Sequence, residues 1–340
     1  MILFLAPCFV SAAQTTTLKT ETLRLEELIQ TTKPICNLYE PDLTLQIASL
    51  KIRPEEDVSN RIKEILSDKP ELDLIVTSEY SLWKGSYNEQ TPRIRIDCEV
   101  KVEGNCLIED MKNGGSIIEE IEEIKELAYL NNVNIILGTL PTQELVETPD
   151  PDLNEPLYNT LVVINRQGNL IGKKMKTKGS DWCIPAKNGK NNQCWIYGDI
   201  HNETREKALS SSRTFTLTSK SNEEFTVFTS ICLDLDDEEM IKQGAGSNAD
   251  LLIWTTETGA DEGIEEITSE VQMGGDLGWG FITGKVIEPY VEKHNTIRDG
   301  GVFIVADRIQ SGLINLKQNP IDSLEITKDF VYGIIELQDR

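Results

Sequence analysis

Cys232 has the residue type and the setting that a thiol-dependent acyl-transfer reaction would need. It directly follows a segment, 225–231, that reads as a buried-type strand, and it precedes an acidic segment that predicts a short helix at 236–243. A cysteine on such a strand-to-helix turn lies near backbone N–H groups and the positive end of a helix, which favour a thiolate and an oxyanion. The alternative is that Cys232 is a small buried apolar residue, the usual role of a free cysteine at a strand end.

Glu79 and a group of lysines that includes Lys176 could assist such a thiol. Glu79 follows the apolar run 73–77 after one residue, Ser78, and a carboxylate at the C-terminal end of a strand lies where α/β folds gather ligands. It could take the proton from the thiol. The lysines end a predicted hairpin, where one cation could lower the pKa of the thiol and hold an oxyanion. Glu79 could instead be a solvated loop acid, and the lysines could protect a sheet edge.

The elements that must position these residues alternate between strands and helices. Strand patterns begin at Leu43 and cover 73–77, 133–137, 160–164, 213–217, 225–231, 251–254, 301–306, 312–316 and 330–337. Helical spacing appears at 55–66, 116–128, 236–243 and 284–297, the second of these with a possible capping box of Ser116 and Glu119. Because the alternation continues without an obvious linker, it predicts one α/β domain over 41–340.

Two polar segments, near 84–115 and 179–211, interrupt this alternation and read as insertions. The first carries Cys98 and Cys106, and the second carries Cys183 and Cys194. In an exported protein such closely spaced pairs suggest local disulfide loops. They could equally be four separate loop thiols, because connectivity cannot be deduced from spacing alone.

The first residues predict a secretory signal peptide over 1–13. Residues 1–10 are an apolar run that is too short to span a bilayer, and small residues follow at 11–13. No Lys or Arg precedes the run, although signals usually carry one. A polar extension then covers 14–40. We therefore expect a secreted or periplasmic protein, or a cytoplasmic one if the run is not a signal.

The composition excludes several classes of partner. Apolar residues make up 39% and charged residues 26% of the chain, as in globular proteins, and the net charge is −24. So acidic a protein is not expected to bind nucleic acid or an anionic membrane surface. No later stretch is apolar enough to cross a membrane. With only His201 and His294, and without CxxC or HExxH spacing, no metal site and no cofactor are expected.

The order of strand–Glu, hairpin–Lys and strand–Cys resembles the carbon–nitrogen hydrolase, or nitrilase, superfamily over roughly 43–337. The matching stretches are Ile75-Val-Thr-Ser-Glu79, Tyr158-Asn-Thr160 with Gly168, Ser230-Ile-Cys-Leu-Asp234, and Ala249-Asp-Leu-Leu-Ile253. The chain departs from the superfamily pattern in four places: Ser78 stands for a proline, Lys174-Met175 for Tyr-Arg, Leu233 for an aromatic residue, and Trp254-Thr255 where a proline is usual.

The resemblance implies an α-β-β-α sandwich and assigns catalytic roles. Cys232 would attack a carbonyl carbon, Glu79 would carry the proton, and Lys176 with the backbone N–H of Leu233 would hold the oxyanion. Counting from Gly168 selects Lys176, although Lys174 and Lys178 share its strand face. A second acid before the hairpin would be Glu144, with Glu147 and Glu155 as competitors.

The resemblance also implies a thiol amidohydrolase that cleaves a non-peptide C–N bond, amide or carbamoyl, of a small-molecule substrate through a thioester. Nitrile hydrolysis or acyl transfer could use the same three residues. The non-enzymatic alternative is a catalytically degenerate binding protein. Because members of the family often pair, the resemblance implies a homodimer. If the chain is exported, it resembles the secreted amidase branch of the family.

Overall fold

The computed structural model describes residues 43–53, 56–82, 92–143, 157–177, 183–184, 193–194, 208–211, 213–232, 234, 238–245, 247–256, 301–307, 311–315 and 322–337. Contacts within the chain separate Met1–Glu40 from Pro41–Arg340, and all described residues belong to the second unit. The predicted signal peptide over 1–13 and the extension over 14–40 therefore lie outside the described residues, as does the helix expected at 284–297.

The larger sheet in the described part of the chain has nine strands. Its main path is β15 (Asp322–Ile326), β16 (Phe330–Leu337), β1 (Leu43–Leu50), β2 (Leu74–Thr77), β5 (Asn134–Gln143), β3 (Arg93–Val102) and β4 (Asn105–Lys112). The hairpin of β6 (Leu157–Ile164) and β7 (Leu170–Met175) continues from β5. Since β1, β2 and β5 are parallel, their C-terminal ends share one edge of the sheet, where Glu79 follows β2.

The second sheet has five strands in the order β10 (Thr214–Thr218), β11 (Glu224–Ile231), β12 (Leu251–Thr256), β13 (Val302–Asp307) and β14 (Gly312–Asn315). The three central strands are parallel, and β10 and β14 flank them as antiparallel partners. Cys232 directly follows β11, so it lies at the C-terminal edge of the parallel strands.

The two sheets pack face to face through alternate side chains of their central strands. Leu74 and Val76 of β2 belong to the same buried cluster as Val227, Ile253 and Ile304 of the second sheet, all with 0% exposure. The neighbouring residues of the parallel strands point to the opposite faces because side chains alternate along a strand. Burying one such aliphatic side chain stabilises the fold by about 1.5–3 kcal/mol.

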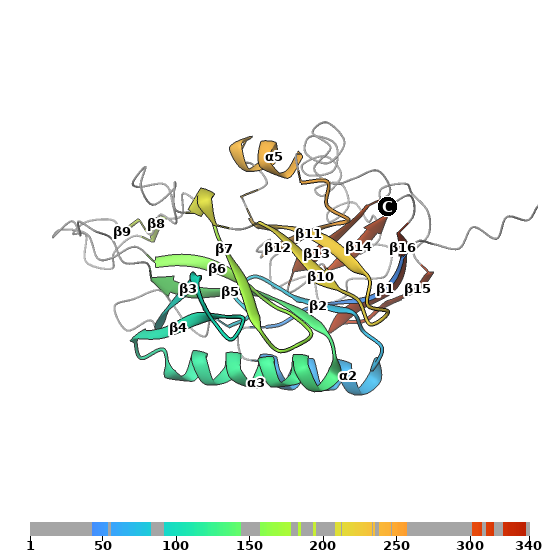
Figure 1. The fold of residues 1–340 in the computed structure, drawn as a ribbon, viewed down its shortest axis with the longest axis horizontal. Coiled ribbons are helices and arrows are strands. Elements are labelled where there is room, and N and C mark those ends of the chain that lie inside the picture. The colour runs from blue at the N-terminus through green and yellow to red at the C-terminus, as the bar shows by residue number, and fades with distance from the viewer. Residues whose placement is uncertain are drawn as a thin grey trace, which may run out of the picture. The chain divides into compact units, whose positions relative to one another are not determined.

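Helices cover the outer faces of both sheets (Figure 1). Ile62 of α2 (Val58–Asp68) and Ile121 of α3 (Gly115–Asn131) are buried in a cluster with Ile75 and Ile135 of the larger sheet. On the other side, α5 (Glu238–Ala245) lies so close to β11 that a Cβ on Gly244 would be 2.9 Å from the ring of Phe228. The predicted α/β class and α-β-β-α sandwich are therefore confirmed.

Some local predictions from the sequence are wrong. The capping box of Ser116 and Glu119 does not form, because α3 already begins at Gly115, its N-cap is Gly114, and no side chain caps it. The hairpin turn predicted after β6, by contrast, is present, with Gly168 at φ 74°. β15 was not predicted, since its residues do not form an apolar run.

The first predicted insertion contains a hairpin, β3–β4, that joins the larger sheet through β5. A turn with φ 52° at Glu103 and φ 85° at Gly104 connects the two strands, and the second half of β3 is exposed. That exposure explains why the segment appears too polar for a strand.

Among the described residues, no helix is both long and apolar enough to span a bilayer.

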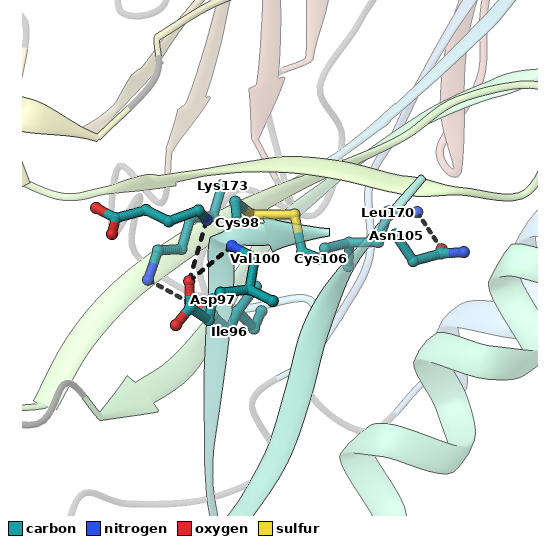
Figure 2. The surroundings of a disulfide bond; sticks show 9 residues. Ile96, Asp97, Cys98, Val100, Asn105, Cys106, Leu170 and Lys173 are labelled. Carbon is teal, nitrogen blue, oxygen red and sulfur yellow. Dashed lines mark hydrogen bonds between the residues drawn. A yellow bond between two sulfur atoms is a disulfide. The ribbon is translucent and has the colours of Figure 1, made fainter. Parts of the chain in front are cut away.

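A disulfide between Cys98 and Cys106 closes the β3–β4 hairpin (Figure 2), so one of the two suggested local disulfides is present. The hairpin is also bound to β7. The Asn105 side chain accepts from the backbone N–H of Leu170 at 2.9 Å, and Lys173 Nζ donates to the carbonyl of Ile96.

The second cysteine pair lies in two short strands, β8 (Cys183–Ile184) and β9 (Gln193–Cys194). These strands pair antiparallel, with Cys183 opposite Cys194 in the register. The backbone thus brings the two positions together, and only the backbone of this pair belongs to the described part of the structure.

Candidate active site

Glu79 is held at the C-terminal end of β2 by a close approach of three strands. Ser78 Oγ donates to the Ile52 carbonyl at 3.2 Å and accepts from the Ile52 N–H at 3.3 Å, which joins the ends of β1 and β2. On the other side, a Cβ on Gly138 of β5 would lie 1.6 Å from the Ser78 carbonyl oxygen, so only glycine fits there. The Ser78 hydrogen bonds thus hold the turn that presents Glu79, a residue that is only 2% exposed.

Lys176 follows β7 and reaches this carboxylate. Its Nζ donates to Glu79 Oε1 at 3.0 Å, and its side chain is 2% exposed. Its backbone N–H donates to the carbonyl of Asn159 at 2.9 Å, which fixes the chain direction beyond the strand end. Of the three lysines that the sequence left open, Lys176 contacts Glu79, Lys174 pairs with Asp234, and Lys178 lies outside the described residues.

Asn159 connects Glu79 and Lys176. Its Nδ2 donates to Glu79 Oε1 at 2.6 Å, while its carbonyl accepts from the Lys176 N–H. Its side-chain Oδ1 is buried without a hydrogen-bond partner. In the sequence, Asn159 is one residue of the Tyr158-Asn-Thr160 motif, and nothing in its spacing indicates a role at the site.

Lys176 keeps its positive charge despite its burial. Burial lowers its pKa, but the negative charges of Glu79 and Cys232, in that order, raise it, and the net result is a pKa above that of an ordinary lysine. The Lys176 ammonium therefore stabilises a thiolate at Cys232 as well as the Glu79 carboxylate. Removing this cation would leave both anions without their buried partner.

Cys232 is half-buried and forms no disulfide, and its φ of 46° lies in the left-handed region. For a residue with a side chain, such a backbone costs on the order of 1–3 kcal/mol and is commonest at functional sites. Its carbonyl accepts a hydrogen bond from Trp254 Nε1 at 2.9 Å. Trp254 therefore holds this sharp turn from the neighbouring strand β12.

Asp234, two residues after Cys232, is fully buried against the segment that carries Lys176. Its Oδ1 accepts from Thr177 N at 2.7 Å and from Thr177 Oγ1 at 2.9 Å, and its Oδ2 lies 3.3 Å from Lys174 Nζ. Like Asn159, Asp234 belongs to a sequence motif whose spacing alone does not predict its contacts. These contacts join the cysteine turn to the end of β7.

Several predicted site residues cannot be placed in the site. Leu233, the expected backbone oxyanion donor, lies outside the described residues, as does Glu144, the expected second acid. The same holds for the competitors of Glu144, Glu147 and Glu155, and for the two histidines, His201 and His294. Of the predicted residues, Glu79, Lys176 and Cys232 are described. Lys176 forms an ion pair with Glu79, and a negative charge at Cys232 raises the pKa of Lys176.

No protein-family profile and no curated protein sequence matches the chain. Among solved structures, the chain is similar to Nit3 of Saccharomyces cerevisiae, a member of branch 10 of the nitrilase superfamily, at 13% identity and a TM-score of 0.48. That match covers 87% of this chain and 91% of the other.

The chain is also similar to a carbon-nitrogen hydrolase from Helicobacter pylori G27, at 13% identity and a TM-score of 0.49, covering 86% of this chain and 89% of the other. A third structure, an amidase from Nesterenkonia sp., has 13% identity and a TM-score of 0.48, covering 87% and 90%. Another structure of that amidase carries the acetamide moiety of fluoroacetamide at its active site cysteine.

Proposed function

We propose that this chain is a thiol amidohydrolase of the carbon–nitrogen hydrolase superfamily, with Cys232 as nucleophile, Glu79 as acid–base and Lys176 as the oxyanion-binding cation. The observation that carries the proposal is the buried ion pair of Lys176 with Glu79 at 3.0 Å, in which Cys232 also raises the pKa of Lys176. Because the free energy of desolvating two charges can exceed their attraction, a buried ion pair that only joined two strand ends would add little stability.

The chemistry begins at the sulfur. Glu79 takes the proton of the Cys232 thiol, and the thiolate adds to the carbonyl carbon of a small amide. A C–S bond forms, and the carbonyl electron pair moves onto the oxygen, where Lys176 Nζ stabilises the negative charge. The backbone N–H of Leu233 is the second donor proposed for this oxygen.

The tetrahedral intermediate then collapses. The C–N bond breaks, the leaving nitrogen takes the proton from Glu79, and ammonia or an amine departs, which leaves an acyl thioester on Cys232. Water gives a proton to Glu79 and attacks the thioester carbon. The C–S bond breaks, the carboxylic acid is released, and Glu79 returns the proton to the sulfur.

The test separates chemistry from substrate choice. Nitrophenyl acetate acylates an activated thiolate without needing a specific pocket, so the wild type should gain one acetyl group at Cys232 in peptide mass spectrometry, and Cys232→Ser should not. Ammonia release from a panel of small amides and carbamoyl compounds then follows the full reaction. If acetylation is spread over surface lysines and absent from Cys232, the proposal is wrong.

We also propose that the protein is exported and forms a homodimer. The disulfide of Cys98 with Cys106 supports export, since disulfides persist in oxidising compartments. Detection of the mature protein in the culture medium or periplasm, with residues 1–13 removed, would support export. Sedimentation at several concentrations would measure the oligomeric state.

A further inference from the structure

Besides Lys176 and Glu79, a second buried ion pair lies beside the proposed nucleophile. Lys174 Nζ is 3.3 Å from Asp234 Oδ2, and both side chains are 0% exposed. Replacing such a pair by apolar residues is often neutral or stabilising, because burying the charges costs about as much as their attraction returns. A buried pair at this place therefore calls for an explanation other than stability.

Asp234 contacts the residues on both sides of Lys176. Lys174, two residues before Lys176, forms an ion pair with the Asp234 carboxylate, and its Nζ donates a hydrogen bond to the Met175 carbonyl. Thr177, one residue after Lys176, donates two hydrogen bonds to Asp234 Oδ1. Asp234 itself is two residues from Cys232. The carboxylate thus connects the cysteine turn to the lysine segment by three contacts, and none of them uses Lys176 itself.

The pair also contributes to the electrostatics of the site. Asp234 is among the negative charges that raise the pKa of Lys176, after Glu79 and Cys232. The charged groups of the described site are then the cations Lys174 and Lys176, the anions Glu79 and Asp234, and the Cys232 thiolate. With a thiolate at Cys232 this set carries two positive and three negative charges, and without Lys174 a single cation would face all three.

We propose that Lys174 and Asp234 are positioning residues, which hold Lys176 against Cys232 and balance the charge around the sulfur. This inference rests on the proposed function of Cys232 and extends it to residues that do not touch the substrate. It also gives the departure from the superfamily pattern at Lys174 a physical purpose.

Neutralising Lys174 and neutralising Asp234 should shift the pKa of the Cys232 thiol in opposite directions. Lys174→Gln removes a cation and leaves Asp234 uncompensated, so the thiolate becomes less favourable. Asp234→Asn removes an anion and leaves Lys174 uncompensated, so the thiolate becomes more favourable. Both substitutions keep an amide that can hydrogen-bond, and Asn can still accept from Thr177.

The experiment is the pH dependence of iodoacetamide labelling at Cys232, resolved by peptide, which needs no substrate. We expect the labelling midpoint to rise by roughly half a unit or more in Lys174→Gln and to fall by a similar amount in Asp234→Asn. Lys125→Gln, which removes a cation from the ion pair with Glu122 on α3, is the control and should not move it. Shifts in the same direction, or none, would overturn the proposal.

The double variant Lys174→Gln/Asp234→Asn covers the case in which a single variant does not fold. It leaves no uncompensated charge, so its midpoint should lie near that of the wild type, while its maximal labelling rate falls by roughly threefold or more because neutral hydrogen bonds are weaker than charged ones. A double variant with wild-type rate and midpoint would contradict the positioning role. If the wild type has an ordinary thiol midpoint but the single variants shift oppositely, the proposed function fails and the charge effect stands.

Discussion

Lys176 Nζ lies 3.0 Å from Glu79 Oε1, although the two residues are 97 positions apart in the chain. The contact joins the residue after β7 to the end of β2, and both side chains are almost completely buried. Removing one partner of such a pair commonly costs about 3–5 kcal/mol, because the other charge is left without compensation. The pair therefore links the stability of the domain to the chemistry of the proposed site.

Glu79→Gln should abolish most turnover without removing the hydrogen-bond acceptor of Asn159 and Lys176. The amide oxygen can still accept, but no carboxylate remains to carry the proton, so kcat/KM should fall by roughly 10²–10⁴-fold. Steady-state kinetics on an amide substrate measures the effect. Glu325→Gln, at a surface ion pair with Lys69, is the matched control and should keep full activity.

Asn159→Ala should weaken both the fold and the site. It removes a 2.6 Å hydrogen bond to the buried Glu79 carboxylate, and hydrogen bonds to charged groups contribute about 1.5–3 kcal/mol. Chemical denaturation should show a loss of this size. If Asn159→Ala is as stable as the wild type, the contact to Glu79 contributes nothing to folding.

Lys51 should give the protein a distinct alkaline pH dependence. Burial lowers its pKa to about 8, although Asp307 and Asp329 partly oppose this effect. Because the folded-state pKa is below the unfolded value of about 10.4, the unfolded chain binds more protons between these values, and stability should rise with pH in that window. The rise should be absent in Lys51→Met, as measured by denaturation from pH 7 to 10.

Loss of the Cys98–Cys106 disulfide should lower stability without changing the thiol chemistry. The bond closes a short loop, with a sequence separation of 8, so its removal by Cys98→Ser/Cys106→Ser should cost roughly 2–3 kcal/mol. The hairpin stays bound to β7 through Asn105, so the labelling midpoint of Cys232 should stay unchanged. A shifted midpoint would mean that the hairpin also controls the site.

The sequence was sufficient to predict the elements with a clear period. The segments before Glu79 and Cys232 become β2 and β11. β2 is buried along its whole length and β11 over its last five residues, which is why both segments read as buried-type strands in the sequence. The hairpin around Gly168 was equally clear, since its turn needs a residue that accepts positive φ. These elements position all three proposed catalytic residues.

Other features depend on contacts that no local pattern encodes. β3 was missed because half of it is exposed and polar, and its place in the sheet is set by pairing with β4 and β5. The partners of Lys174 and Lys176 could not be separated by spacing, because both lysines lie on one strand face. Only the three-dimensional arrangement assigns one to Asp234 and the other to Glu79.

The most direct test of the central claim is the rate of iodoacetamide labelling at Cys232 as a function of pH, in the wild type and in Lys176→Met. We predict a wild-type midpoint below about pH 7, and a midpoint at least about one unit higher in Lys176→Met, because the buried cation that stabilises the thiolate is gone. A wild-type midpoint near the ordinary thiol value of about 8.5, unchanged in Lys176→Met, would contradict the account.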